Sequence, residues 1–285
     1  MARNRPRHPS SSPTTRPDRS PAPGHRPARP GRHAGRHDDG HWLYGRHAVL
    51  AALANPIREV RQILMTRDAQ ARLGQELAEA GVRRGEPVTG AQLVDRHDID
   101  AALGHDAVHQ GIAAYVGPLP DRDLADILGG NDDEAMVLMV LDQVTDPHNV
   151  GAVMRSAEAF GAAAVVVTER NAPEESGAMA KSASGAVDRI PLIRVVNLVR
   201  ELDYLKSRGF WILGLAGEAN QNLAEAQPGG RVALVLGAEG DGLRRLTREH
   251  CDLLVRLPMA GTMPSLNVSN AAAVALYELN RTNLA

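Results

Sequence analysis

The sequence contains a single cysteine, Cys251, so no disulfide can form within the chain. Absence of disulfides fits a reducing compartment, and we expect a cytoplasmic location. No apolar run approaches the roughly 18 residues that a membrane-spanning helix needs, and no secretory signal is recognisable. We therefore expect no membrane partner.

Aromatic residues and lysine are also scarce. Phe, Trp and Tyr make up 3% of the chain, and Lys181 and Lys206 are its only lysines. So few rings argue against the aromatic stacking platforms of proteins that bind single-stranded nucleic acids. Almost all the basic residues are arginines, whose planar guanidinium suits bidentate contacts to phosphate.

Residues 1–40 differ in composition from the rest of the chain. They carry nine arginines against three aspartates, a net +6, which leaves −8 for the remainder because the whole chain has a formal charge of −2. They have hardly any aliphatic side chains, so we predict a disordered tail. It is either a basic arm that attracts RNA phosphates or a solvated extension without a necessary role. Its irregularly spaced histidines do not indicate a metal site, and we expect no metal in this protein.

We predict two folded domains. Residues 41–118 should form a small α/β domain, and residues 119–133 a polar linker in which 124–128 could make a helical turn. Residues 134–285 should form the larger domain. The expected elements of the small domain are a helix from residue 44, a helix at Asp68–Ala80 capped by Asp68 and stopped by Gly81, and strands at Val60–Met65, Pro87–Val88 and Gly111–Val116.

The larger domain alternates aliphatic strands with amphipathic helices. Continuous aliphatic runs are typical of parallel strands that are buried on both faces, so we expect a doubly wound α/β sheet. The predicted strands are Met136–Leu141, Ala164–Thr168, Ile190–Val195, Phe210–Ala216, Arg231–Leu236 and Leu253–Leu257. The predicted helices are Asn149–Phe160, Pro173–Ser182, Asn197–Arg208, Leu243–Glu249 and Val268–Arg281.

Three strand-to-helix transitions of this domain carry polar residues. In the first, Asn149 and Arg155 lie off the buried stripe of the predicted helix, and His148 is interpreted as a loop residue. Asn149 could simply cap that helix, and Arg155 could simply pair with Glu158.

The second transition has the sequence GAEGDG at residues 237–242, and the third runs from Leu257 to Asn270. The glycine spacing of the second differs from the dinucleotide fingerprint, so an NAD site fits poorly. Glu239 could bind a ligand or be an exposed turn residue. Ser265 could cap the last helix, and the third loop could be a plain turn. Because ligands bind at the carboxyl ends of parallel strands, the three loops could converge on one site.

The three stretches resemble the three motifs of the SpoU (TrmH) branch of the SPOUT RNA ribose 2′-O-methyltransferases. The matching residues are Asn149-Val150-Gly151 with Arg155, the run 237–242, and Pro258–Gly261 with Ser265–Ser269. Residues 44–49 and 108–112 are similar to the substrate-binding domain of the same family. The Thr262-Met263-Pro264 run departs slightly from the small residues expected before Ser265.

The resemblance implies a SPOUT-type parallel sheet with a C-terminal trefoil knot, preceded by a ribosomal-protein-like substrate-binding domain. It implies S-adenosylmethionine as cofactor, RNA as partner and a homodimer. Arg155 would be the catalytic arginine, and Asn149, Glu239, Ser265 and Asn267 would order the site. The cofactor would contact Gly237, Leu257 and Leu266, with Leu236, Met259 and Gly261 beside them.

The combination of motifs most resembles the members that methylate a guanosine ribose in 23S rRNA. A tRNA ribose, an rRNA adenosine and a non-catalytic role in ribosome assembly remain alternatives, and a nucleotide-dependent oxidoreductase fits least. Arg155 could serve as the base. However, a guanidinium is rarely neutral at neutral pH, so the alternative is that Arg155 grips phosphate and stabilises developing alkoxide charge.

Overall fold

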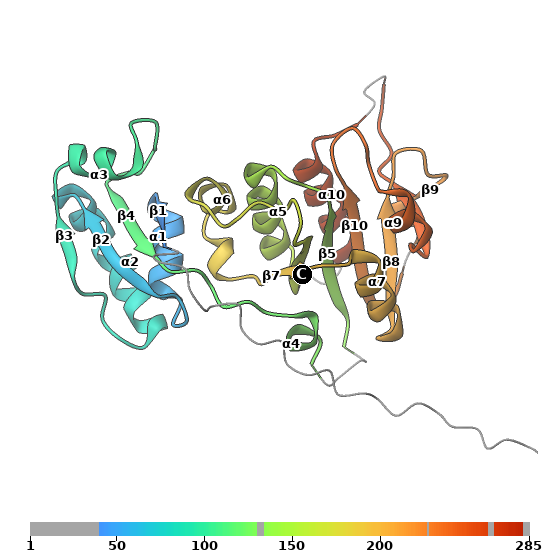
Figure 1. Cartoon of the computed structure of the whole chain (residues 1–285), viewed down its shortest axis with the longest axis horizontal. Coiled ribbons are helices and arrows are strands. Elements are labelled where there is room, and N and C mark those ends of the chain that lie inside the picture. The colour runs from blue at the N-terminus through green and yellow to red at the C-terminus, as the bar shows by residue number, and fades with distance from the viewer. Residues whose placement is uncertain (1–39, 130–133, 227, 262–264, 282–285) are drawn as a thin grey trace, which may run out of the picture. The chain divides into compact units, whose positions relative to one another are not determined.

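The computed structural model describes residues 40–129, 134–226, 228–261 and 265–281, which contain two β-sheets (Figure 1). The predicted disordered tail lies outside the described residues, apart from Gly40. No helix in these ranges is long and apolar enough to cross a membrane.

The smaller sheet has four strands in the order β1-β4-β2-β3. Its elements are β1 (His41–Tyr44), α1 (Arg46–Ala54), β2 (Val60–Met65), α2 (Arg67–Arg84), β3 (Ala91–Leu93), α3 (Arg96–Leu103) and β4 (Ile112–Val116). The strand β1, which pairs antiparallel with β4, was not predicted from the sequence. The prediction of a strand at Pro87–Val88 was wrong, because the strand of this region is β3, which pairs with β2.

The predicted stop of α2 at Gly81 was also wrong. Thr66 caps this helix in place of the predicted Asp68, which lies in its first turn, and the helix continues to Gly85, whose left-handed φ of 87° ends it. A Cβ at Gly81 would lie 3.0 Å from the carbonyl oxygen of Glu86. Gly81 thus lets the following chain pack closely against the helix rather than ending it.

The larger sheet has seven strands in the order β7-β6-β5-β10-β8-β11-β9, and all of its paired strands are parallel. The strands are β5 (Met136–Asp142), β6 (Ala164–Thr168), β7 (Leu192–Val195), β8 (Phe210–Leu215), β9 (Gln221–Asn222), β10 (Arg231–Gly237) and β11 (Leu253–Arg256). The predicted parallel sheet is therefore confirmed. Only the two-residue edge strand β9 was not predicted.

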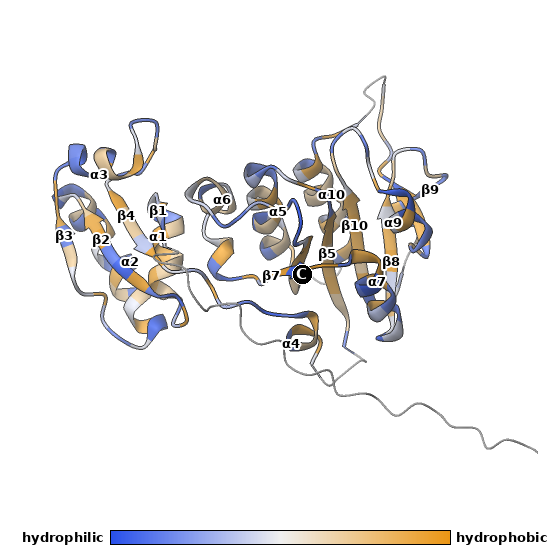
Figure 2. Cartoon of the chain, viewed as in Figure 1, coloured by the Kyte–Doolittle hydropathy of each residue, from blue (hydrophilic) through white to orange (hydrophobic). Residues whose placement is uncertain are grey.

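Helices cover both faces of this sheet. They are α5 (Pro147–Ala159), α6 (Gly177–Ala183), the 3-10 turn η1 (Ala186–Asp188), α7 (Leu198–Ser207), α8 (Leu223–Ala226), α9 (Arg245–Glu249) and α10 (Val268–Asn280). Along β5, Met139 and Leu141 pack in the cluster with α5, α6 and α10, whereas Leu138 and Val140 pack in the cluster with α7. This alternation explains why the strand is apolar throughout (Figure 2).

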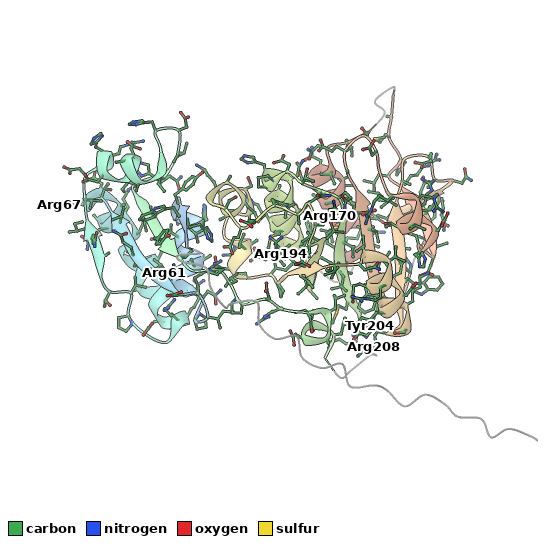
Figure 3. The ribbon with its side chains drawn as sticks, viewed as in Figure 1. Arg61, Arg67, Arg170, Arg194, Tyr204 and Arg208 are labelled. Atoms are coloured by element: carbon green, nitrogen blue, oxygen red, sulfur yellow. The ribbon has the colours of Figure 1, made fainter. Side chains whose placement is uncertain are left out.

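The predicted linker contains a short helix, α4 (Leu124–Leu128), whose first and last leucines are buried. Arg208, labelled near Tyr204 in Figure 3, donates a hydrogen bond from Nη1 to the Tyr204 hydroxyl over 3.1 Å. Its Nη2 donates to the carbonyl oxygen of Gly129 over 3.1 Å. The linker is thus attached to the end of α7.

A buried ion cluster joins the chain around α1 to the chain around η1. The side chain of Arg58 is 0% exposed and lies 2.8 Å from the Asp188 carboxylate and 2.6 Å from that of Glu175. Burial raises the pKa of Asp188. At Glu175 the nearby His41 and Arg58 outweigh the effect of burial, so the pKa of Glu175 is lowered. Arg58 compensates two carboxylates that would otherwise be desolvated without a cation.

Replacing Arg58 with Met should therefore lower the free energy of unfolding by about 3 kcal/mol, because two buried carboxylates lose their cation. Arg83→Gln is the matched control, since Arg83 forms an exposed pair with Glu79 and should cost less than about 0.5 kcal/mol. Urea unfolding of the three proteins measures the difference. Equal effects from the two substitutions would contradict the account of the cluster.

Candidate active site

The polar loops identified in the sequence leave the same edge of the larger sheet. β5, β10 and β8 are adjacent and parallel, and β11 follows β8. Their carboxyl ends therefore lie together, and the loops to α5, α9 and α10 start from one side of the sheet. This arrangement is where open α/β sheets bind ligands.

The first loop brings Asn149 to this edge inside a helix. α5 begins at Pro147, two residues earlier than predicted, and Asp146 caps it by accepting a hydrogen bond from the backbone N–H of His148. His148 is thus in the first turn rather than in a loop, and its Nδ1 lies 3.0 Å from Ser182 Oγ. Because Asp146 is the cap, the amide of Asn149 is available for other contacts.

The third loop ends at Asn267, which caps α10. Its Oδ1 accepts hydrogen bonds from the backbone N–H groups of Ser269 (2.9 Å) and Asn270 (3.4 Å). The prediction that Ser265 caps this helix was wrong, since the cap lies two residues later. Capping occupies the oxygen of the Asn267 amide and leaves its NH₂ group to donate.

Glu239 connects the three loops through one carboxylate oxygen. Its Oε1 accepts hydrogen bonds from Asn149 Nδ2 (3.2 Å), Asn267 Nδ2 (2.5 Å) and the backbone N–H of Val268 (3.3 Å). Asn267 Nδ2 also donates to Asn149 Oδ1 over 3.0 Å. A carboxylate at the N-terminus of α10 is favoured by the unpaired N–H groups of the first turn. Three of the five residues predicted to order or catalyse at the site are thus in direct contact.

The glycines of the second loop allow it to fold back tightly. The backbone N–H of Gly242 donates to the carbonyl oxygen of Ala238 over 3.0 Å, which closes the loop. A Cβ on Gly237 would lie 2.0 Å from the backbone carbon of Gly242, so no other residue fits there without moving the loop. Glu239 is held inside the closed segment, which limits where its carboxylate can point.

A cavity of about 480 Å3 lies against this loop. Five of the six residues predicted to contact a cofactor line it: Leu236, Gly237, Leu257, Met259 and Leu266. Glu239 and Ser265, which were predicted to order the site, line it too. Gly261 is exposed and is not among the lining residues. The volume is that of a pocket for a small molecule.

The loop after β8 also contributes to the cavity, which was not predicted from the sequence. Residues 215–218 line the cavity beside Gly237, and the Glu218 carboxylate forms an ion pair with Arg248, another lining residue. Hydrogen bonds from its own backbone N–H and from Arg248 lower the pKa of Glu218. The sequence contained a signal that could have identified this loop, because it also follows a buried parallel strand, one that lies next to β10.

Arg155 lies on α5 and is exposed. Within the part of the chain that the structure describes, it forms no hydrogen bond or ion pair. The alternative of a pair with Glu158 was wrong, because Glu158 pairs with Arg189. The guanidinium of Arg155 is therefore available to a ligand, although it makes no contact with the Asn149–Glu239–Asn267 network.

A second polar cluster at this edge was also missed. Asn171 Nδ2 donates to Gln143 Oε1 over 2.7 Å, and Gln143 Nε2 donates to Thr168 Oγ1 over 3.3 Å. Gln143 and Asn171 both have left-handed backbones, with φ of 66° and 73°. The cluster ties the loop after β5 to the loop after β6 at the cost of two unfavourable backbone conformations.

The single thiol does not supply a nucleophile here. Burial raises the pKa of Cys251 to about 11, so its thiol is protonated at neutral pH. The described residues also contain no group of three or more His, Cys, Asp or Glu side chains that could hold a metal ion. The side chains that line the cavity include three carboxylates, Glu218, Glu239 and Asp241, together with Ser265 and Arg248.

Comparison with known families matches both parts of the chain. The model of the SpoU rRNA Methylase family matches residues 136–277. The model described as RNA 2′-O ribose methyltransferase substrate binding matches residues 42–121. The first range contains the larger sheet, and the second contains the smaller sheet apart from His41.

Similar proteins and structures agree with these matches. The 23S rRNA (guanosine-2′-O-)-methyltransferase RlmB of Vibrio vulnificus is 42% identical over 251 residues, which cover 86% of this chain and 98% of the relative. The protein of the same name from Escherichia coli K12 is 41% identical over 84% of this chain and 97% of its own length.

Among solved structures, the SpoU methyltransferase AviRb from Streptomyces viridochromogenes, in complex with the cofactor AdoMet, superposes with a TM-score of 0.68 at 25% identity. That match covers 87% of this chain and 91% of AviRb. A structure of an RNA 2′-O ribose methyltransferase has a TM-score of 0.68 at 26% identity, covering 87% of this chain and 90% of the other.

Replacing Gly237 with Ala should destabilise the protein by about 1–3 kcal/mol, because the added methyl group forces the loop away from Gly242. Gly229→Ala is the control, since a Cβ there meets nothing within 4 Å, and its effect should be within about 0.5 kcal/mol. Urea unfolding measures both. An unchanged midpoint for the Gly237 variant would show that the loop is not closed as described.

Proposed function

Because the chain belongs to the SpoU rRNA methylase family, we propose that it transfers a methyl group from S-adenosylmethionine to the ribose 2′-oxygen of a guanosine in 23S rRNA. The observation that carries this proposal is the meeting of Asn149, Glu239 and Asn267 beside a cavity at the carboxyl edge of the sheet. The names of the relatives in Vibrio vulnificus and Escherichia coli support 23S rRNA as substrate and guanosine as target.

The cavity fits S-adenosylmethionine in size and chemistry. Leu215, Leu236 and Leu266 offer apolar surface for an adenine ring, and the closely packed backbone at Gly237 offers polar groups without a side chain in the way. Leu257, Met259 and Ser265 complete the wall. When bound, the cofactor supplies the electrophilic methyl group of its sulfonium. Ligand-bound AviRb supports this choice of cofactor.

The residues of the chain must orient and activate a weak nucleophile. A ribose hydroxyl attacks only when it is held in line with the methyl group and loses its proton. Asn149 and Asn267, fixed by Glu239, order the loops around the reacting groups. Ser265 contributes to the same wall of the site.

Arg155 supplies charge stabilisation in this proposal. Its guanidinium is exposed and without an ion pair among the described residues, so it can grip the phosphate beside the target ribose. From there it stabilises the negative charge that develops on the 2′-oxygen. A positively charged guanidinium does not need to be neutral for this role, which makes it compatible with the high pKa of arginine.

We further infer that the enzyme is a cytoplasmic homodimer. Val274 and Tyr277, both on α10, are 50% and 52% exposed, and the Tyr277 ring packs edge-on against Phe160 with centroids 5.7 Å apart. A second copy of the chain would cover this apolar face. The trefoil knot implied by the resemblance would use the third loop, in which residues 262–264 lie outside the described residues, so the knot stays a prediction.

Methyl transfer from labelled S-adenosylmethionine, with total RNA from a host that lacks this protein, tests the proposed function. We expect label at one guanosine of 23S rRNA, located by mapping its 2′-O-methyl group. Arg155→Gln should reduce the rate at least about a hundredfold, the cost of losing a group that stabilises charge in a transition state. Label in tRNA or at an adenosine would show that the proposed substrate is wrong and leave the proposed chemistry standing. Absence of transfer to any RNA would contradict the proposed activity.

Sedimentation equilibrium tests the proposed dimer, with an expected mass about twice the 30.5 kDa of the chain. Tyr277→Asp should shift the mass towards the monomer, because a charge would be buried without a partner. Arg245→Asp, an exposed change on α9, should leave the mass of the dimer unchanged. A monomeric wild-type protein would contradict this part of the proposal.

A further inference from the structure

A second carboxylate, which the proposed mechanism does not use, lies beneath the Glu239 loop. Asp142 is the last residue of β5 and is 0% exposed. It accepts hydrogen bonds from Arg244 Nε over 2.7 Å and from the backbone N–H of Arg244 over 3.1 Å. Arg244 Nη2 lies 2.6 Å from the same carboxylate. A buried carboxylate needs such partners, because burying a charge without compensation is costly.

Arg244 occupies the point where the second loop ends. The loop closes on itself through the hydrogen bond from Gly242 to Ala238, and Arg244, two residues after Gly242, is the cap residue of α9. The pair with Asp142 therefore fastens the base of the loop to the end of the neighbouring strand. Glu239 lies within the loop that is fastened in this way.

The same pair, between the buried Asp142 and the half-exposed side chain of Arg244, also lies at the start of the first loop. The chain leaves β5 at Asp142 and reaches Asn149 seven residues later. Asn149 then contacts Glu239, which lies five residues before Arg244. The stretches 142–149 and 239–244 are thus joined at both ends, by the Asp142–Arg244 pair and by the Asn149–Glu239 hydrogen bond. A shift of the chain at one of these contacts would strain the other.

We propose that Asp142 and Arg244 are positioning residues for the methyl transfer. They act through Glu239. Their pairing fixes the position of the loop 237–242 relative to the sheet, and this position places the Glu239 carboxylate between Asn149 and Asn267. It also sets the wall of the cavity formed by residues 236–243. This inference rests on the proposed function, because it assigns the loop to a cofactor site.

A double-mutant cycle tests whether Arg244 acts through Glu239. The measured quantity is the Kd of S-adenosylhomocysteine, obtained by calorimetry. Arg244→Gln and Glu239→Ala should each weaken binding about tenfold. The double variant should also bind only about tenfold more weakly than wild type, because both substitutions break the same set of linked contacts. A hundredfold loss in the double variant would mean independent effects and would overturn the inference.

Two further variants separate positioning from general damage to the fold. Arg245→Gln is the matched control, because Arg245 is the next residue, is 75% exposed at its side chain and pairs with Glu249 on the surface. Its Kd should equal that of wild type. Asp142→Asn combined with Arg244→Gln should bind more tightly than Arg244→Gln alone, because the unpaired buried charge is removed.

The outcomes also distinguish this inference from the proposed function. If wild type does not bind S-adenosylhomocysteine at all, the proposed function fails. If wild type binds it but the cycle is additive, or if Arg245→Gln weakens binding as much as Arg244→Gln does, only the positioning role fails.

Discussion

The site depends on one carboxylate oxygen that three segments share. Oε1 of Glu239 receives N–H groups from the Asn149 and Asn267 side chains and from the backbone of Val268. These donors belong to the helices that follow β5 and β11, whereas Glu239 follows β10. Loops that contact the sheet only at their ends are otherwise free to move apart. The shared acceptor is what makes three separate turns into one site.

The larger sheet makes this contact possible. Its paired strands are all parallel, so the chain leaves β5, β10 and β11 at the same edge each time. Close packing within the second loop requires glycine at position 237, and an ion pair between the buried Asp142 and the half-exposed Arg244 fastens this loop to the end of β5. Electrostatic preorganisation of this kind reduces the rearrangement that the groups would otherwise undergo during the reaction.

Local sequence patterns predicted the parts of this arrangement but not their contacts. The aliphatic runs predicted the strands of the larger sheet, except for β9, because burial on both faces demands such runs. The motif residues predicted Asn149, Glu239 and Asn267 as members of one site. The predicted caps were wrong at both α5 and α10. Asp146 caps α5 in place of Asn149, and Asn267 caps α10 in place of Ser265, because these neighbours compete for the same N–H groups. Only the structure shows which neighbour is placed to accept.

Other features depend on residues that are distant in the sequence. Nothing in the run around Asp142 indicates that Arg244 reaches it, and nothing around Arg58 indicates Asp188 or Glu175. The strand β1 was missed because its pairing with β4, about seventy residues later, defines it more than its own composition does. Pairs of this kind depend on the tertiary fold, which a pattern of local spacing does not contain.

Hydrogen exchange of the Glu239→Ala variant tests the central claim most directly. If one carboxylate holds the three segments together, its loss should speed exchange in peptides covering residues 143–150 and 265–271, which are remote from position 239 in the sequence. Asp241→Ala, in the same loop, should leave both peptides as in wild type. Faster exchange confined to residues 237–243 would contradict the account, because it would mean that the three loops are ordered independently.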